Sequence, residues 1–166
     1  MHKPGIAIFQ YNWPLQSYSK DIAIILSENG FQVDFFLYDE SGDNLVDTKD
    51  LIEAGVDLLR FHEKTEFNGI LGKLYWRFLV YFSSKIIHAT QVAISRHILF
   101  HSWVKLRRRS YNCFIGIEKQ GLNWAGIFGD YANTKTIYYS LELYIEDHPH
   151  FNRIKYLRDQ EKHYHA

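Results

Sequence analysis

Two apolar runs in the second half of the chain constrain its fold most. Residues 113–117 and 136–141 have the length and composition of buried strands, and a glycine-containing segment of helical character separates them. This order predicts a β-α-β unit with two parallel strands. Glu118 and Glu142 directly follow the two strands. Because ligands bind at the carboxyl ends of strands in open α/β sheets, both acids are candidate catalytic residues.

Strand-like and helix-like segments alternate along the rest of the chain as well. Short apolar runs predict further strands, and runs with helical periodicity predict helices between them. The predicted strands span residues 5–10, 31–38, 56–61, 113–117 and 135–141. The sequence therefore predicts an α/β fold: a Rossmann-like parallel sheet of about five or more strands with helices on both faces.

The predicted helices differ in how sharply the sequence bounds them. A first helix begins near Ser17, places Ile22, Ile25 and Leu26 on its inner face, and ends at Asn29-Gly30. A helical region over 70–109 divides near Ser83-Ser84 or Thr90. Further helices are predicted over 122–131 and, with a basic amphipathic pattern, over 151–166, whereas 39–50 is predicted to be a surface loop.

Composition narrows the class of protein. A length of 166 residues with 46% hydrophobic residues suits one domain, 1–166. A formal net charge of zero argues against a nucleic-acid partner, despite the basic cluster at 105–109. The N-terminus lacks a signal-peptide pattern, so the chain is expected to be cytoplasmic. The single cysteine, Cys113, is expected to be a buried small side chain rather than a nucleophile.

The loop after the first strand lacks the glycines of a phosphate-binding loop. No dinucleotide fingerprint occurs there, and no Gly-Lys-Ser or Gly-Lys-Thr occurs anywhere in the chain. Polar side chains flanked by aromatic rings are suited to contact a sugar instead, although ordinary turn packing is the alternative. The candidate substrate-binding residues of this loop are Asn12, Trp13, Gln16 and Ser17.

Glu118 begins a second polar segment at a predicted strand end. Lys119 and Gln120 follow it, and Gly121 leads into the next helix. The N-terminus of that helix could receive an anion, while the alternative is a solvated turn whose acid interacts with the helix dipole. Lys119 and Gln120 are therefore further candidates for substrate binding.

Glu142 and His62 stand at two other predicted strand ends. Glu142 lies in an apolar run, where a carboxylate costs free energy unless it is paired or functional. His62 follows the third strand and is a candidate for contact with a ligand.

Histidine pairs give only weak evidence for a metal. His148 with His150 and His163 with His165 lack an accompanying cysteine or HExxH pattern, so solvated surface histidines are expected and no metal or cofactor is predicted. His88, His97 and His101 of the long helical region are expected to pack or to face solvent.

The region over 76–109 mixes aromatic and basic residues. Such a pattern is compatible with attachment to an anionic membrane surface. The alternative, which we favour, is two helices that cover the sheet and carry a basic outer face. Lys73, Arg77 and Lys85 interrupt each stretch that is long enough to span a bilayer.

The order of these segments resembles the N-terminal half of a GT-B fold glycosyltransferase of the family 4 type. The segments that carry the resemblance are 5–10, 17–30, 31–34, 113–121, 138–143 and 153–164. The resemblance implies an acceptor-binding half. A nucleotide-sugar would be held mainly by a C-terminal Rossmann-like domain, whose donor-binding glutamate pair has no counterpart in this chain. It also implies that no metal is needed.

Two features depart from the family's pattern. Many members have a glycine in the first loop and a histidine near the end of the fourth strand, where this chain has Glu118-Lys119-Gln120. Glu118 and Glu142 are therefore catalytic candidates by position alone.

The function expected from the resemblance is transfer of a sugar from a nucleotide-sugar donor to a glycan or lipid-linked acceptor, as in polysaccharide biosynthesis. This chain alone is expected to be inactive. Two alternatives stay open: a non-catalytic flavodoxin-like or Rossmann-like binding module, and a membrane-surface adaptor. The expected location is the cytoplasm, with a possible peripheral contact with the membrane.

Overall fold

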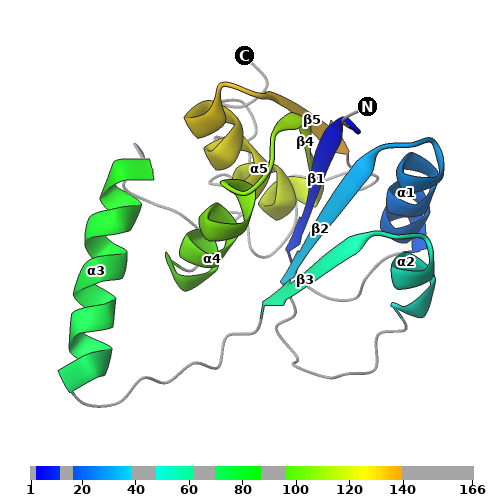
Figure 1. The fold of residues 1–166 in the computed structure, drawn as a ribbon. Helices are drawn as coiled ribbons and strands as arrows, with labels where there is room; N and C mark the ends of the chain where they lie inside the picture. The colour runs from blue at the N-terminus through cyan, green and yellow to red at the C-terminus, as the bar shows by residue number, and fades with distance from the viewer. Residues whose placement is uncertain (1–2, 12–16, 39–47, 62–69, 87–95, 140–166) are drawn as a thin grey trace, which may run out of the picture.

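In a computed structural model of the chain, the structure describes residues 3–11, 17–38, 48–61, 70–86 and 96–139 (Figure 1). These residues form five strands and five helices. The strands are β1 (Gly5–Tyr11), β2 (Gln32–Tyr38), β3 (Asp57–Phe61), β4 (Tyr111–Ile117) and β5 (Lys135–Tyr139). The helices are α1 (Ser17–Glu28), α2 (Lys49–Glu53), α3 (Ile70–Ile86), α4 (Arg96–Leu106) and α5 (Glu118–Ala132).

The strands form one parallel sheet in the order β3-β2-β1-β4-β5. The prediction of an α/β fold with a parallel sheet is therefore confirmed. The order also decides one alternative, because a flavodoxin-like sheet has the order 2-1-3-4-5. The flavodoxin-like module is thus wrong, while the Rossmann-like topology holds.

Each central strand contributes side chains to both faces of the sheet. Ile6 and Ile8 of β1 pack on one face, while Ala7 and Phe9 pack on the other. Because side chains on both faces of these strands are buried, apolar and polar residues hardly alternate in the sequence of the central strands.

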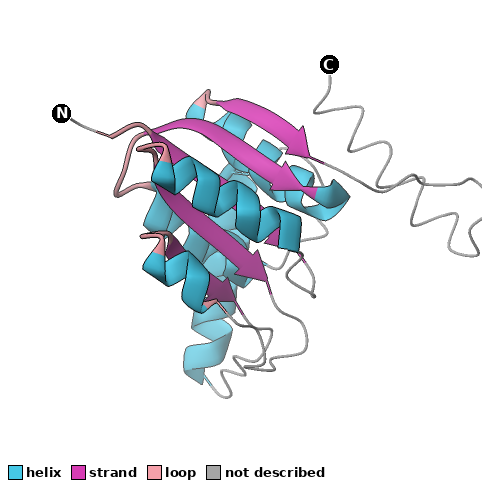
Figure 2. Cartoon of the chain, turned by 90° about the vertical axis from the view of Figure 1, so that its right-hand side faces the viewer, coloured by secondary structure: helices cyan, strands magenta, loops and turns pink. Residues whose placement is uncertain are grey.

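Helices cover both faces (Figures 1 and 2). Ala23 of α1 and Leu51 of α2 belong to the core on one face, and α4 and α5 enclose the other. The core on the face covered by α4 and α5 centres on Trp124, which is fully buried. The centroid of its ring lies 5.3 Å from that of Phe9 and 5.5 Å from that of Phe61. The helix α3 packs on α4 at the edge of the molecule.

Several predicted details were wrong. Ile25 is 56% exposed rather than on the inner face of α1, where Ala23 is buried. The predicted loop over 39–50 overlaps the start of α2, and α5 begins at Glu118 rather than at 122. A division of the long helical region at Ser83-Ser84 is wrong, because both residues lie within α3, whereas Thr90, the other predicted point of division, lies outside the described residues. None of the described helices combines the length and hydropathy needed to cross a membrane.

Candidate functional site

The sheet has one topological switch point, between β1 and β4. From β1 the chain order runs outward through β2 and β3 on one side and through β4 and β5 on the other. Ligands of open α/β sheets bind in the crevice at the carboxyl ends of the strands that flank such a point. The helices α1 and α5 begin at this edge, so the polar groups in their first turns define the candidate site.

Glu118 occupies the first position of α5, directly after β4. Its φ angle is 56°, in the left-handed region that residues other than glycine rarely adopt. Such a conformation costs about 1–3 kcal/mol and is frequent at functional sites. The prediction that Glu118 stands at the strand end is confirmed, but the polar turn expected over 118–121 is in fact the first turn of the helix.

Tyr18 joins Glu118 across the switch point. The Tyr18 hydroxyl donates a hydrogen bond of 2.9 Å to Oε1 of Glu118, although 100 residues separate the two in sequence. The ring of Tyr139, at the end of β5, lies 5.6 Å from the Tyr18 ring in a tilted arrangement. The two tyrosine rings and the carboxylate therefore form a small half-buried cluster at the carboxyl end of the sheet.

A buried hydrogen bond fixes the start of α1 beside this cluster. The Ser19 hydroxyl donates to Oε1 of Gln10 over 2.6 Å, and both side chains are buried. Because Gln10 belongs to β1 and Ser19 to the first turn of α1, the bond holds the helix against the end of the central strand.

Two glycines allow α5 to begin so close to the sheet. A Cβ atom on Gly116 would lie 2.3 Å from Cα of Leu122, and one on Gly121 would lie 2.3 Å from the carbonyl oxygen of Phe9. Only glycine permits an approach this close. The spacing of Gly116 and Gly121 on either side of Glu118 was visible in the sequence as a signal for close packing of helix on strand.

The other predicted site residues divide into two groups. Gln120 is half-buried in the first turn of α5, and the backbones of Ser17 and Lys119 lie at the starts of α1 and α5. The side chains of Ser17 and Lys119 lie outside the described part of the structure, as do the whole residues Asn12, Trp13, Gln16, His62 and Glu142. Their roles therefore stay predictions.

Sequence reasoning missed Asn123. This residue is 1% exposed, and its side-chain nitrogen has no hydrogen-bond partner among the described residues. A buried amide donor without a partner costs about 1–3 kcal/mol. The signal was an asparagine directly between two large apolar residues, Leu122 and Trp124.

The amino end of the sheet holds a different polar cluster. The buried Asp34 carboxylate accepts hydrogen bonds from Arg109 and from the Tyr111 hydroxyl, and Arg109 and Lys105 also contact Asp57 at 3.1 and 2.7 Å. The prediction that the basic cluster forms an outer face is thus wrong for Lys105 and Arg109. Arg107 and Arg108 are exposed, as predicted.

The pKa shifts in this cluster follow from burial and pairing. Burial raises the pKa of Asp34 despite its hydrogen bond from Tyr111, whereas the hydrogen bond from Lys105 lowers the pKa of Asp57. Burial, together with the Asp34 carboxylate, raises the pKa of Tyr111. These groups bind each other, which indicates a structural role.

Histidines and the cysteine give no centre for metal or nucleophilic chemistry in the described residues. No group of three or more potential ligands from His, Cys, Asp and Glu lies together there. Ring nitrogens of His97 and His101 lie 2.8 and 3.4 Å from the Tyr75 hydroxyl; His97 is half-buried between α3 and α4, and His101 is exposed beside it. Burial raises the pKa of the half-buried Cys113 thiol, which favours its unreactive protonated form.

Comparisons with known proteins support the fold. No protein family model matches the chain, and no curated protein matches it significantly. Among solved structures, the calicheamicin glycosyltransferase CalG4 superposes with a TM-score of 0.54 at 10% identity, covering 96% of this chain and 36% of CalG4. The glycosyltransferase of kitacinnamycin gives a TM-score of 0.49 at 10% identity, covering 96% of this chain and 41% of that protein.

At 10% identity the likeness to CalG4 concerns the fold alone. The chain spans little more than a third of the CalG4 length, and the part it spans is one Rossmann-like half. The chain therefore has the fold of one half of a GT-B glycosyltransferase.

Proposed function

We propose that this chain is the acceptor-side half of a glycosyltransferase that moves a sugar from a nucleotide-sugar donor to a glycan or lipid-linked acceptor. The observation that carries the proposal is the pairing of Tyr18 with Glu118 at the switch point of a sheet with the GT-B half fold. A second Rossmann-like domain would hold the donor opposite this edge. Acceptor binding is then the task of the residues at the ends of β1, β4 and β5.

The chemistry of the cluster suits a sugar acceptor. An ionised carboxylate accepts hydrogen bonds only, and sugar hydroxyls donate them. The rings of Tyr18 and Tyr139 offer flat apolar surfaces beside Glu118, against which a sugar ring can stack. In transfer, Glu118 would take the proton of the acceptor hydroxyl as its oxygen attacks the anomeric carbon and the nucleoside diphosphate leaves. Glu142 remains the alternative base.

Acceptor binding tests this proposal directly. Saturation-transfer NMR against a panel of oligosaccharides should find at least one binder, and Glu118→Gln should weaken that binding by about tenfold or more, because the amide replaces a charged acceptor. Tyr18→Phe should weaken it less. The matched control is Glu28→Gln, an exposed acid at the opposite end of α1, which should bind as the wild type does.

Two results would overturn the proposal. One is an oligosaccharide affinity that Glu118→Gln leaves unchanged. The other is a nucleotide-sugar that binds this chain more tightly than any acceptor does, because the donor would then belong to this half. Sugar binding that depends on Glu118, without transfer when a donor-binding domain is supplied, would favour a non-catalytic Rossmann-like binding module.

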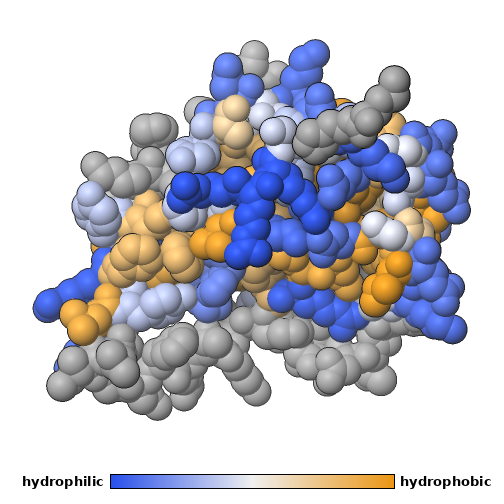
Figure 3. Space-filling view, in the orientation of Figure 1, coloured by the Kyte–Doolittle hydropathy of each residue, from blue (hydrophilic) through white to orange (hydrophobic). Residues whose placement is uncertain are grey.

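A second candidate role, contact with a membrane surface, rests on the outer side of α3. The large apolar side chains Leu74, Phe78 and Tyr81 are 56, 47 and 65% exposed. Lys73 and Arg77 are exposed beside them, and the helix contains no acidic residue. In Figure 3 apolar and hydrophilic side chains lie side by side where α3 forms the left of the molecule. This combination suits an anionic lipid surface.

Co-sedimentation with vesicles tests the membrane contact. Vesicles of phosphatidylglycerol and phosphatidylcholine should bind the chain, and vesicles of phosphatidylcholine alone should bind it less. Leu74→Glu should remove most of the binding, because Leu74 is 56% exposed, whereas Phe78 also packs on Phe100 of α4. Ile52→Glu is the matched control, because Ile52 is 64% exposed on α2, which packs on the opposite face of the sheet. Equal binding of both variants would contradict a role for α3.

A further inference from the structure

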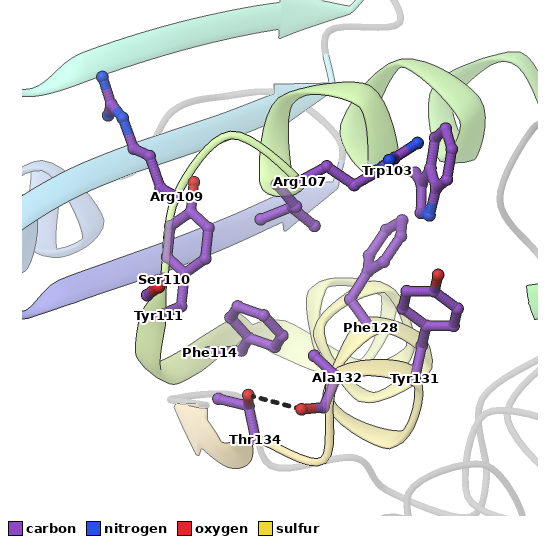
Figure 4. Close-up of a pocket in the computed structure, with 11 residues that line it drawn as sticks. Trp103, Arg107, Arg109, Ser110, Tyr111, Phe114, Phe128, Tyr131, Ala132 and Thr134 are labelled. Atoms are coloured by element: carbon purple, nitrogen blue, oxygen red, sulfur yellow. Dashed lines mark hydrogen bonds between the residues drawn. The ribbon is translucent and has the colours of Figure 1, made fainter.

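A pocket lies at the amino end of the sheet, away from the candidate acceptor site. It has a volume of about 330 Å³ and is enclosed by the C-terminal ends of α4 and α5 and the start of β4 (Figure 4). Helix α5 connects the two sites, because it begins at Glu118 at one end of the sheet and its last turn borders the pocket at the other. The helix has 15 residues, which at a rise of 1.5 Å each separates the two sites by about 22 Å. The volume lies within the range of small-molecule sites.

Five of the eleven residues that line the pocket are aromatic. Trp103 comes from α4, Tyr111 and Phe114 from β4, and Phe128 and Tyr131 from α5. The rings of Tyr111 and Phe114 lie 5.5 Å apart, and Tyr131 is 53% exposed at the entrance. Walls of this kind favour a flat, unsaturated ligand, because stacked and edge-on contacts between rings add binding free energy to that of burying apolar area.

The charged side chains of the lining are all cationic. Arg107 and Arg109 border the pocket, and no carboxylate does so among the lining residues. The Arg109 guanidinium forms ion pairs with Asp34 and Asp57. Arg107 forms no ion pair with any described residue, and its guanidinium lies 4.5 Å from the centre of the Trp103 ring. A cation–π contact thus positions a guanidinium group with its hydrogen-bond donors available at the pocket rim.

A second donor lies beside this guanidinium. The indole nitrogen of Trp103 is buried, and among the described residues nothing accepts its hydrogen bond. Figure 4 shows Trp103, Phe128 and Tyr131 together at one end of the pocket, with Arg107 next to the indole. A buried N–H group without an acceptor costs free energy that an anionic ligand can recover.

We propose that this pocket binds a small planar aromatic carboxylate. The ring of the ligand packs against Tyr111 and Tyr131, because Phe114 and Phe128 are only 1% exposed. Its carboxylate accepts hydrogen bonds from Arg107 and from the Trp103 indole. Arg–carboxylate pairs form such contacts in bidentate geometry. The site requires both parts of the ligand, since the walls supply ring contacts and the rim supplies cationic donors.

Calorimetry with 2-naphthoate and the full chain tests both requirements. We expect saturable binding with a Kd below about 1 mM. Neutral 2-naphthamide should bind about tenfold more weakly, because it has no negative charge and only one acceptor oxygen, so it cannot form a bidentate ion pair with Arg107. Cyclohexanecarboxylate should also bind about tenfold more weakly, because it lacks the aromatic ring.

Two arginines next to each other in sequence provide the matched variants. Arg107→Gln should raise the Kd for 2-naphthoate about tenfold, whereas Arg108→Gln should change it less than about twofold, because Arg108 is exposed but does not border the pocket. Trp103→Phe keeps an aromatic wall and removes the N–H group, so a weaker loss is expected. Both arginine positions are exposed, and unchanged circular dichroism would verify the fold.

Three results would overturn the inference. They are the absence of saturable binding for 2-naphthoate, equal affinities for 2-naphthoate and 2-naphthamide, and equal losses in the Arg107 and Arg108 variants. Equal losses in the two arginine variants would mean that the affinity for 2-naphthoate depends only on the positive charge of this region and not on Arg107 itself. The Glu118→Gln variant should bind 2-naphthoate as the wild type does, so this test is independent of the proposed acceptor site.

Discussion

The two ends of the sheet hold their acidic side chains differently. At the amino end, the Asp34 carboxylate accepts hydrogen bonds from Arg109 and from Tyr111, and Asp57 extends the network by accepting from Arg109 and Lys105. At the carboxyl end, Glu118 has a left-handed backbone, and the nearby helix α5 contains a buried amide donor without a partner among the described residues.

This difference separates structural polar groups from functional candidates. Hydrogen bonds occur at both ends, so what distinguishes Glu118 from Asp34 is its strained backbone, and such strain persists where something else favours it. Arg109 and Arg107 also differ, although only one residue separates them in sequence. Arg109 is ion-paired with Asp34, whereas Arg107 borders the pocket and has no ion pair with a described residue.

Arg109→Leu should produce the largest loss of stability, because it leaves the fully buried Asp34 carboxylate without its cation. We expect the free energy of unfolding to fall by about 3–5 kcal/mol, as measured by urea denaturation. Arg108→Leu is the control and should change it by less than about 0.5 kcal/mol. A double variant with Asp34→Leu should recover part of the loss. Equal effects of the two single variants would contradict a structural role for the amino-end network.

Gly121→Ala should produce the next largest effect, because its methyl group would meet the Phe9 carbonyl oxygen. We expect a loss of about 1–3 kcal/mol in the free energy of unfolding, together with a displaced α5. Gly30→Asn provides the comparison, since Gly30 has a positive φ and open space around it, so a loss below about 1 kcal/mol is expected. Similar losses would mean that close packing of α5 is not critical.

Glu118→Gly should separate strain from function at the carboxyl end. Glycine removes the cost of a left-handed backbone, about 1–2 kcal/mol, but adds about 0.5–1 kcal/mol of unfolded-state entropy. We therefore expect stability that is unchanged or slightly higher, combined with the loss of oligosaccharide binding. Glu118→Ala removes the same carboxylate without relieving the backbone. If Glu118→Gly were clearly less stable than Glu118→Ala, the left-handed conformation would not be a source of strain.

The smallest effect should be the pH dependence that Asp57 contributes. Its pKa is lowered in the folded state from the ordinary value of 3.8, so its contribution to stability is present above that pH and is lost as the pH falls. The stability difference between wild type and Asp57→Asn, followed by denaturation from pH 6 to 2, should start below about 1 kcal/mol and shrink as acid is added. A difference that grew on acidification would reverse the assigned sign.

The sequence predicted the fold because its strands are long apolar runs at regular spacing. The ends of β1 and β4 were placed within a residue or two, since Gly5 and Glu118 mark sharp changes in composition. The prediction that Ile25 lies on the inner face of α1 was wrong, because it followed from hydrophobicity alone. The smaller Ala23 packs against the sheet instead.

The candidate site was predicted only in part. Position at a strand end was enough to find Glu118, because β4 and α5 adjoin in sequence. Its contact with Tyr18 joins residues 100 positions apart, and no local pattern specifies such a pairing. The same limit applies to Arg109 and Asp34, which the sequence presents as a basic cluster and as one acid within a strand.

The position of β1 has a consequence for how the chain folds during synthesis. Among the five described strands, β1 comes first along the chain and is the central one of the sheet, with β2 on one side and β4 on the other. Its second edge has no partner until β4, which begins at Tyr111, has left the ribosome. Until then an apolar strand edge is open to other chains, so we expect nascent chains that end before Tyr111 to aggregate and to be bound by chaperones.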